Sequence, residues 1–276
     1  MDFGRIGIWI SRRRHGAEVA REVEDLGFGA LWVGGSPSVE QMRPYLEATT
    51  RIPVASGILN VWQHEPGDVA RDFAAADEEF GGRFVLGIGV GHPESRSDYT
   101  RPLARMRAFF DGLDEAAQPV PRDKRLAAAL GPKMLDLAAE RSLGTHPYFT
   151  VPEHTRFARE RVGPGVLVAP ELAVVLEPDV ETARGIARAY AESYLQLRNY
   201  TSNLLRFDFT EDDIAGGGSD RLIDAVIPHG DPARIGEAAR EHLDAGADHV
   251  CLQPLGGHGP APLDDLRALA RELLGS

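Results

Sequence analysis

Glycines gather where chemistry would take place in a sheet protein, directly after short apolar stretches that we predict to be strands. These positions are Gly34-Gly35-Ser36, Ser56-Gly57-Ile58, Gly87-Ile88-Gly89-Val90-Gly91-His92, Ala129-Leu130-Gly131 and Thr145-His146-Pro147. Because glycine has no Cβ, the backbone at a strand end can lie directly against a flat or phosphorylated ligand. The pattern therefore predicts a glycine-lined site for a ligand of that kind.

The segment Gly131-Pro132-Lys133-Met134 is the clearest local sign of such a site. It leads straight into a predicted helix over residues 135–140. Free N–H groups and the positive end of a helix dipole attract phosphate, and Lys133 would add a counter-charge. The segment favours a phosphate-binding turn, although glycine followed by proline is also simply a good way to begin a helix.

Several other kinds of chemistry lack the residues that they need. No lysine lies in the second half of a predicted strand, which argues against a Schiff-base enzyme. The nine histidines show no metal-ligand spacing, so we expect no metal site, and no Gly-x-Ser-x-Gly nucleophile motif occurs. The glycines from Gly87 to Gly91 precede a proline rather than a helix, so they form no dinucleotide fingerprint. A phosphate-binding mouth with few catalytic groups suits a bound redox cofactor.

The elements that must position these residues are indicated by a recurring junction, in which a helix ends near a glycine and an apolar strand follows. The junction occurs at Gly27, Gly81, Gly144 and Gly246. It is typical of the second half of a parallel βαβ unit, in which glycine ends the helix and the strand is buried on both faces. The repeat predicts helices packed on a parallel sheet.

Eight strands can be counted along the chain. We place them at 5–10, 30–33, 52–59, 84–90, 125–130, 143–149, 172–176 and 249–252. Eight strands with interleaved helices favour an α/β fold of the (β/α)8 TIM-barrel type, which needs about 250 residues and fits a single domain over 1–276. An open, doubly wound sheet is the alternative.

One long segment exceeds what a barrel requires. Residues 188–230, between the seventh and eighth strands, carry extra helical pattern and the flexible run Gly216-Gly217-Gly218. Because loops after strand ends build the active face of a barrel, this insertion is a candidate lid. It would otherwise only lengthen the outer ring of helices.

Composition and charge exclude several partners. A formal net charge of −12 argues against nucleic acid and anionic membrane surfaces. No run of about 18 apolar residues occurs, so we expect no membrane span. No signal peptide is evident, and the single cysteine, Cys251, cannot form a disulfide within the chain. A cytoplasmic protein is the simplest interpretation.

Taken together, several segments resemble the bacterial-luciferase-like flavin and deazaflavin oxidoreductases. The residues from Arg83 to Pro93 resemble the fourth-strand segment of that family. Four further segments resemble the branch that uses the 8-hydroxy-5-deazaflavin coenzyme F420: 129–135, 144–148, 152–155 and 247–250. The resemblance extends over nearly the whole chain. It implies a TIM barrel that transfers hydride between F420 and a small organic substrate, and a homodimer.

The resemblance also implies roles for particular residues. The cofactor-binding residues would be Ser56, Gly57, Ile58, Gly89, Val90, Gly91, Ala129, Leu130, Gly131, Pro132, Lys133 and Met134. The first six would flank the ring, with a cis peptide bond expected at Gly57-Ile58, and the last six would hold the phosphate. His92 and His146 would be the catalytic groups, as hydrogen-bond donors or proton relays. Each could instead be a structural histidine bonded to the backbone.

The chain also departs from the family pattern. Many relatives have a carboxylate or histidine after the second strand, where this chain has Gly34-Gly35-Ser36. Either His92 replaces that group, or hydride delivery suffices, or activity is lost. After the first strand, Arg12-Arg13-Arg14-His15 would either contact an anionic cofactor tail or form a solvated basic loop.

Three alternative functions stay open. The first is an FMN-dependent monooxygenase of the same family, in which reduced flavin reacts with oxygen. The second is a non-catalytic flavin-binding protein, as the bare end of the second strand suggests. The third is a sugar-phosphate isomerase or lyase, which would explain the phosphate turn but needs a carboxylate base that the sequence does not place.

Overall fold

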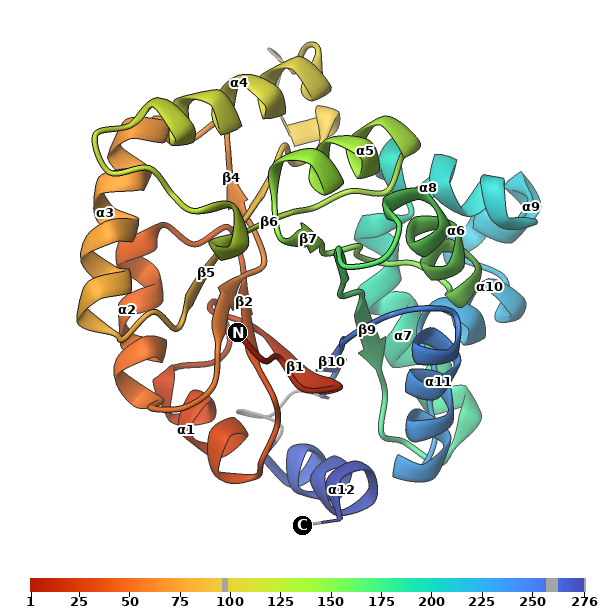
Figure 1. The fold of residues 1–276 in the computed structure, drawn as a ribbon. Coiled ribbons are helices and arrows are strands. Elements are labelled where there is room, and N and C mark those ends of the chain that lie inside the picture. The colour runs from red at the N-terminus through yellow and green to blue at the C-terminus, as the bar shows by residue number, and fades with distance from the viewer. Residues whose placement is uncertain (96–98, 257–262, 276) are drawn as a thin grey trace.

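A ring of parallel strands surrounded by helices forms the fold in the computed structural model, which describes residues 1–95, 99–256 and 263–275 (Figure 1). The strands are β1 (Ile6–Ser11), β2 (Leu31–Gly34), β3 (Val54–Ser56), β4 (Leu59–Asn60), β5 (Phe84–Gly89), β6 (Arg125–Ala127), β7 (Gly144–Thr145), β8 (Leu167–Val168), β9 (Glu171–Val174) and β10 (Val250–Pro254). Neighbouring strands are hydrogen-bonded in the order β8-β7-β6-β5-β3-β2-β1-β10-β9.

The two ends of this strand order are adjacent in the chain, and this adjacency closes the ring. β8 pairs with β7, and β9 pairs with β10, while only Ala169 and Pro170 separate β8 from β9. The carbonyl of Pro170 accepts a hydrogen bond from the amide of Cys251 at 3.0 Å. The chain is therefore a TIM barrel, as predicted, and the open-sheet alternative is wrong.

The helices form the outer layer. They are α1 (Ala17–Asp25), α2 (Val39–Ala48), α3 (Pro66–Glu79), α4 (Pro102–Glu115), α5 (Pro132–Arg141), α6 (Pro152–Val162), α7 (Val180–Tyr194), α8 (Arg198–Leu204), α9 (Glu211–Ile214), α10 (Asp220–Val226), α11 (Pro232–Asp244) and α12 (Leu263–Leu274). Proline at the first position begins several of them, where its missing N–H costs no hydrogen bond. Among the described residues, no helix has the length and apolarity to cross a membrane.

Successive side chains of a strand point to opposite faces of the sheet, and this divides the core into two layers. Ile8 and Ile10 of β1 pack in the large cluster between the sheet and the helices. Trp9, between them, belongs to a separate cluster inside the ring, together with Trp32 and Cys251. This period of two is what a strand buried on both faces requires. It directs Trp9 toward the barrel interior, at the end where the strands finish.

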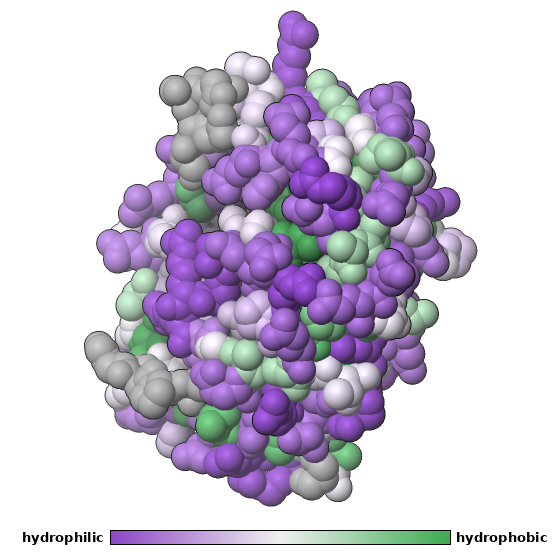
Figure 2. All heavy atoms as spheres, turned by 90° about the vertical axis from the view of Figure 1, so that its left-hand side faces the viewer, coloured by the Kyte–Doolittle hydropathy of each residue, from purple (hydrophilic) through white to green (hydrophobic). Residues whose placement is uncertain are grey.

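The outer surface is mainly polar. Figure 2 shows the face on the left of Figure 1, where hydrophilic residues predominate and hydrophobic ones are scattered. In the described part of the chain, the exposed large hydrophobic side chains are Met1, Val180, Leu205 and Leu274. Such isolated residues are ordinary on a protein surface.

The predicted strand limits need correction at four places. The third strand is not continuous over 52–59 but is divided into β3 and β4 by the Gly57-Ile58 peptide. The fifth ends at Ala127, and the sixth is only Gly144–Thr145, because Pro147 follows and Phe149 has a positive φ of 51°. The seventh begins at Leu167 and is interrupted by Pro170, which has no N–H to donate.

The predicted insertion between the seventh and eighth strands is present as a series of short helices. After α7 the chain forms α8, α9 and α10 before it reaches α11 (Figure 1). Ser219 caps α10 by accepting a hydrogen bond from the amide of Leu222, and Thr210 and Asp213 form a capping box at α9. These caps fix helices that are too short to be stable alone.

Candidate functional site

Trp9 covers the end of the second strand. A Cβ added at Gly34 would lie 1.8 Å from Cζ2 of Trp9, so any side chain there would collide with the indole ring. Trp9 is buried, and its ring centroid is 5.5 Å from that of Tyr148. The place where family relatives are expected to carry a carboxylate or histidine is thus filled by an aromatic ring from the neighbouring strand.

The Gly57-Ile58 peptide lies beside this ring. It is a cis peptide bond, as predicted. A Cβ at Gly57 would stand 2.8 Å from Nε1 of Trp9 and 3.4 Å from Nε2 of His146. Both of these nitrogen atoms are buried without a hydrogen-bond partner. Two unpartnered polar atoms therefore approach one glycine, although buried polar groups usually have partners.

The other predicted ring-binding residues continue from this peptide. A Cβ at Gly89 would be 2.8 Å from Cδ1 of Ile58, and one at Gly91 would be 2.8 Å from Nδ2 of Asn60. Ser56 is buried, and its hydroxyl bonds both the carbonyl and the amide of Gly87 at 2.9 Å. The structure thus brings 56–58 and 89–91 together, with Ser56 holding the two strands in place.

His146 lies inside the barrel beneath these glycines. Its Nδ1–H donates to the carbonyl of Ala169 at 2.7 Å, and its ring stacks on Trp32 with centroids 4.3 Å apart. Burial lowers the pKa of His146 to about 4, so the ring is neutral at pH 7. A neutral, fully buried imidazole that donates Nδ1–H to the backbone has no proton to give from Nε2. This arrangement favours a positioning role.

His92, by contrast, is only half-buried at the mouth. Its Nδ1 is 2.9 Å from the side-chain oxygen of Asn199, so the ring donates from Nδ1 and carries a lone pair on Nε2. The ring centroid is 5.1 Å from that of Tyr200. Both partners belong to α8, so the insertion between the seventh and eighth strands contributes directly to the surroundings of His92.

A group of hydrogen-bonded tyrosines lies at the mouth, and the sequence reasoning missed it. The hydroxyl of Tyr148 is 2.6 Å from that of Tyr190, 3.3 Å from that of Tyr194 and 2.8 Å from Oε1 of Gln253. Burial raises the pKa of Tyr148 well above its usual value of 10, so its hydroxyl keeps its proton. The sequence does contain one sign of this group. Tyr190 and Tyr194 are four residues apart, a spacing that places both side chains on the same face of a helix.

Glu171 is a second residue that was missed. It is buried inside the ring, where Oε2 accepts a hydrogen bond from the amide of Phe149 at 3.2 Å, while Oε1 has no partner. Burial raises the pKa of Glu171 to about 8, so the carboxyl is protonated at neutral pH. A lone acid at the start of the apolar run Glu171-Leu172-Ala173-Val174 is the signal for it.

The predicted phosphate turn forms the beginning of α5. Gly131 is the N-cap residue, with no side chain capping the helix, and Lys133 is exposed. The carbonyl of Leu130 accepts a hydrogen bond from Nε2 of His154 at 3.0 Å, which anchors the turn. Met134 packs partly against the outer core. The turn is ordered and open, as an anion-binding helix start needs to be.

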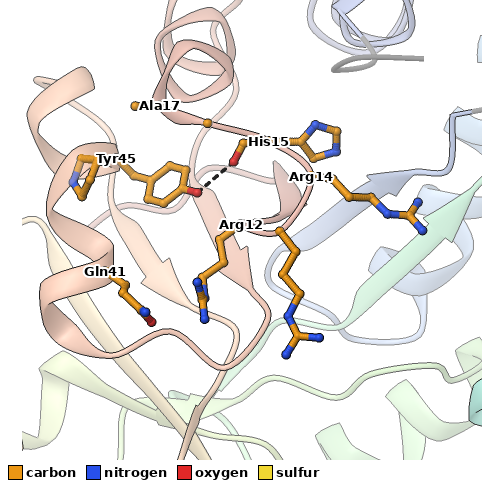
Figure 3. Close-up of a pocket in the computed structure, with 9 residues that line it drawn as sticks. Arg12, Arg14, His15, Ala17, Gln41 and Tyr45 are labelled. Carbon is orange, nitrogen blue, oxygen red and sulfur yellow. Dashed lines mark hydrogen bonds between the residues drawn. The ribbon is translucent and has the colours of Figure 1, made fainter. Parts of the chain in front are cut away.

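A cavity of about 490 Å³ opens beside the turn after β1 (Figure 3). Its lining consists of Arg12, Arg13, Arg14, His15, Gly16, Ala17, Gln41, Pro44 and Tyr45. Tyr45 of α2 donates from its hydroxyl to the carbonyl of His15 at 2.9 Å. The basic turn that the sequence indicated therefore borders an open hollow on the surface.

Comparison with known proteins identifies the family. The family described as luciferase-like monooxygenase matches residues 9–249. A curated relative, the 5,10-methylenetetrahydromethanopterin reductase of Archaeoglobus fulgidus, is 24% identical over 91% of this chain and 92% of its own. A putative coenzyme F420-dependent oxidoreductase of Mycobacterium tuberculosis is 24% identical over 54% of this chain and 55% of its own.

The fold agrees with these matches. A solved F420-dependent secondary alcohol dehydrogenase, in complex with an F420-acetone adduct, superimposes with a TM-score of 0.75. The superposition covers 98% of this chain and 97% of that one, at 15% identity, which demonstrates a common fold. The chain belongs to the luciferase-like monooxygenase family of oxidoreductases.

Proposed function

We propose that this protein is an F420-dependent oxidoreductase that transfers hydride between the deazaflavin and a small organic substrate with an activated C=C, C=O or C=N bond. The observation that carries the proposal is the pair of curated relatives, a reductase that aligns over nearly the full length and an oxidoreductase named for F420. When bound, the coenzyme supplies the hydride chemistry, and the protein supplies binding and orientation.

The residues at the mouth fit such a flat coenzyme. Gly57, Gly89 and Gly91 let the backbone of two neighbouring strand ends pack closely, since a Cβ at each would lie 2.8 Å from a side-chain atom of Trp9, Ile58 or Asn60. We assign the ring to the strip from Ser56–Ile58 to Gly89–Gly91, and the phosphate to the turn from Ala129 to Met134. The unpartnered Nε1–H of Trp9 is available beside that strip as a donor.

His92 is the group we assign to proton movement. Because its Nδ1–H is held by Asn199, the lone pair on Nε2 is free to accept a proton or to orient a substrate hydroxyl. The hydroxyl of Tyr148 donates its single proton to Oε1 of Gln253, so it can only accept a further hydrogen bond near the mouth. His92 replaces the carboxylate or histidine that the second strand lacks. We assign His146 the task of supporting Trp32 and Gly57 from below.

The second candidate is an FMN-dependent monooxygenase, which the description of the matching family favours. The same glycine strip and the same phosphate turn would hold FMN, so the two candidates differ only in which cofactor binds. A small-molecule substrate is common to both. The homodimer implied by the resemblance is part of the proposal, and sedimentation velocity of the purified chain would test it.

Side-by-side equilibrium binding of F420 and FMN tests the proposal. We expect F420 to bind more tightly, and Gly89→Val to weaken it at least tenfold, because the added side chain would overlap Ile58 and displace the peptide to which we assign the ring. Gly185→Ala on the exposed face of α7, with nothing within 4 Å of its added Cβ, is the control and should bind as the parent does. Preference for FMN would replace the proposal with the second candidate. Binding of neither would overturn both.

A further inference from the structure

We propose that the cavity beside the turn after β1 is a binding site for an extended, multiply charged anion carrying phosphate or carboxylate groups. Arg12, Arg13 and Arg14 all line it, and none of its nine described lining residues is acidic. The whole chain has a formal net charge of −12, so three adjacent arginines at one cavity stand out. Arginine is the side chain best suited to bind phosphate and carboxylate.

Backbone hydrogen bonds hold the turn that carries these arginines. The amides of Arg14 and His15 donate to the carbonyl of Ser11 at 2.9 and 3.0 Å, and the amide of Arg12 donates to that of Gly34 at 3.3 Å. The Nε of Arg12 also donates to the carbonyl of Gly35 at 3.1 Å. A fixed backbone lowers the entropic cost of ligand binding at a charged turn.

Within the described ranges the three arginines have no carboxylate partner, whereas arginines elsewhere in the protein, such as Arg141 and Arg184, each form ion pairs. The carboxylate of Glu18, close in sequence, accepts a hydrogen bond from the amide of Gly16. The positive charge of the turn is therefore available to a ligand.

Two further features of the lining bear on the choice of ligand. Nδ1 of His15 is buried without a hydrogen-bond partner, so the lining contains an unsatisfied polar atom. Gly16 and Ala17 are the N-cap and first residue of α1, but the amide of Gly16 already donates to the carboxylate of Glu18, which offsets the positive end of the helix dipole there. Arg12 lies opposite Gln41 and Tyr45 of α2 (Figure 3), which form the other wall.

The charge of the turn also acts on a residue of the barrel mouth. Arg14 leaves the turn in a different direction from Arg12 (Figure 3) and acts electrostatically on Tyr194 of the tyrosine group. Gly35, which Arg12 holds, directly follows the Gly34 that Trp9 covers. A ligand seated at the mouth could thus extend charged groups along Arg14 and into the cavity.

The anion has two candidate sources with the same chemistry: the anionic tail of the deazaflavin coenzyme, or an anionic substrate. The choice between them rests on the proposed function, but the anion site itself does not. An experiment can therefore test the anion site and the proposed function separately.

Calorimetric titration of the whole chain with inorganic tripolyphosphate tests the site. We expect binding by the parent protein and at least a tenfold weaker affinity in the double variant Arg12→Gln/Arg14→Gln. Arg240→Gln, an exposed arginine of α11 far along the chain from the turn, is the matched control and should bind as the parent does. Arg13→Gln/Arg14→Gln changes only exposed side chains, so it still tests the site if loss of the Arg12 bond to Gly35 impairs folding. Absence of binding by the parent, or equal binding by the variants, would overturn the proposal.

A second titration distinguishes the sources. If the coenzyme tail occupies the site, the double variant weakens F420 but not the tail-free deazaflavin chromophore, and F420 competes with tripolyphosphate. If a substrate anion occupies it, the variant leaves F420 binding unchanged, and tripolyphosphate binds equally to the free and the F420-loaded protein. Should the parent bind tripolyphosphate but no F420, the anion site would stand and the proposed function would fall.

Discussion

At the residue scale, Trp9 and Gly34 form a complementary pair that explains the bare end of the second strand. The indole occupies the volume that a side chain at position 34 would need. Because Nε1 of Trp9 makes no hydrogen bond, shape alone holds the ring in this place. An aromatic ring therefore borders the end of β2, and position 34 has no room for an ionisable side chain.

A double-mutant cycle tests this pairing. Gly34→Ala should cost about 1–3 kcal/mol of unfolding free energy, because the new methyl group overlaps the indole and the core cannot expand freely. In a Trp9→Leu background the same change should cost less than about 0.5 kcal/mol, since the overlapping ring atoms are gone. Urea unfolding of the four proteins measures both costs. Equal costs in the two backgrounds would contradict the pairing.

The sequence predicts some of the site and not the rest, for reasons that particular residues show. Glycines at 57, 89 and 91 were visible because backbone proximity to a ligand requires that residue type. Tyr148 and Glu171 were not, because their importance depends on which side chains the closed ring brings together. A buried acid with one unpartnered oxygen is a property of its surroundings, and no local pattern encodes those surroundings.

At the element scale, the insertion contributes to the site through α8. The amide of Arg198 at the start of α8 donates to the carboxylate of Glu94 at 3.0 Å, and this bond lowers the pKa of Glu94. The N-cap residue, Leu197, has no side chain that can accept a hydrogen bond. A residue from the loop after β5 therefore caps a helix more than a hundred positions later, beside the bond between His92 and Asn199.

Removal of this remote cap should loosen α8. We expect Glu94→Ala to cost α8 about 0.5 kcal/mol, the low end of the capping range because the carboxylate is exposed. Amide hydrogen exchange over residues 198–204 should then be two- to threefold faster. Glu192→Ala, an exposed acid on α7, is the control. Unchanged exchange in the Glu94 variant would show that α8 is held by packing alone.

The order of helices and strands was easier to predict than the residues at which each begins and ends. The starts of α7 and α11 are encoded locally, because the side chains of Asp179 and Asp231 accept hydrogen bonds from the amides of Thr182 and Arg234. The strand limits were less accurate, since β7 and β8 have only two residues each and carry no periodicity. Their pairing depends on closure of the ring, and the strand propensities of single residues carry no information about that closure.

At the scale of the whole molecule, four fully buried histidines make stability depend on pH. Burial lowers the pKa of His146, His154 and His249 to about 4 and that of His242 to about 3. Each stays neutral in the folded state but takes up a proton in the unfolded state below about pH 6.5. Their contribution to stability is present above that pH and is lost as the pH falls toward 4.

We therefore expect the free energy of unfolding to fall steeply between pH 6 and 4.5. Glu171 opposes the histidines in this window, because its carboxyl is protonated in the folded state and ionised in the unfolded state. These five groups together take up about three protons on unfolding, which corresponds to a contribution of about 4 kcal/mol per pH unit to the slope. Urea unfolding across this range measures the slope. A slope below about 1 kcal/mol per pH unit would mean that the histidines are protonated in the folded protein.

The position of β10 in the ring has a consequence for biosynthesis. β1 spans Ile6–Ser11, yet one of its two hydrogen-bonding partners is β10, which begins at Val250. At about 5–20 residues per second, a ribosome needs roughly 10 to 50 seconds between them, and the free edge of β1 stays open throughout. An open apolar edge of this kind is a template for pairing with other chains. Nascent chains of this protein should accordingly be candidates for chaperone binding until the last strand emerges.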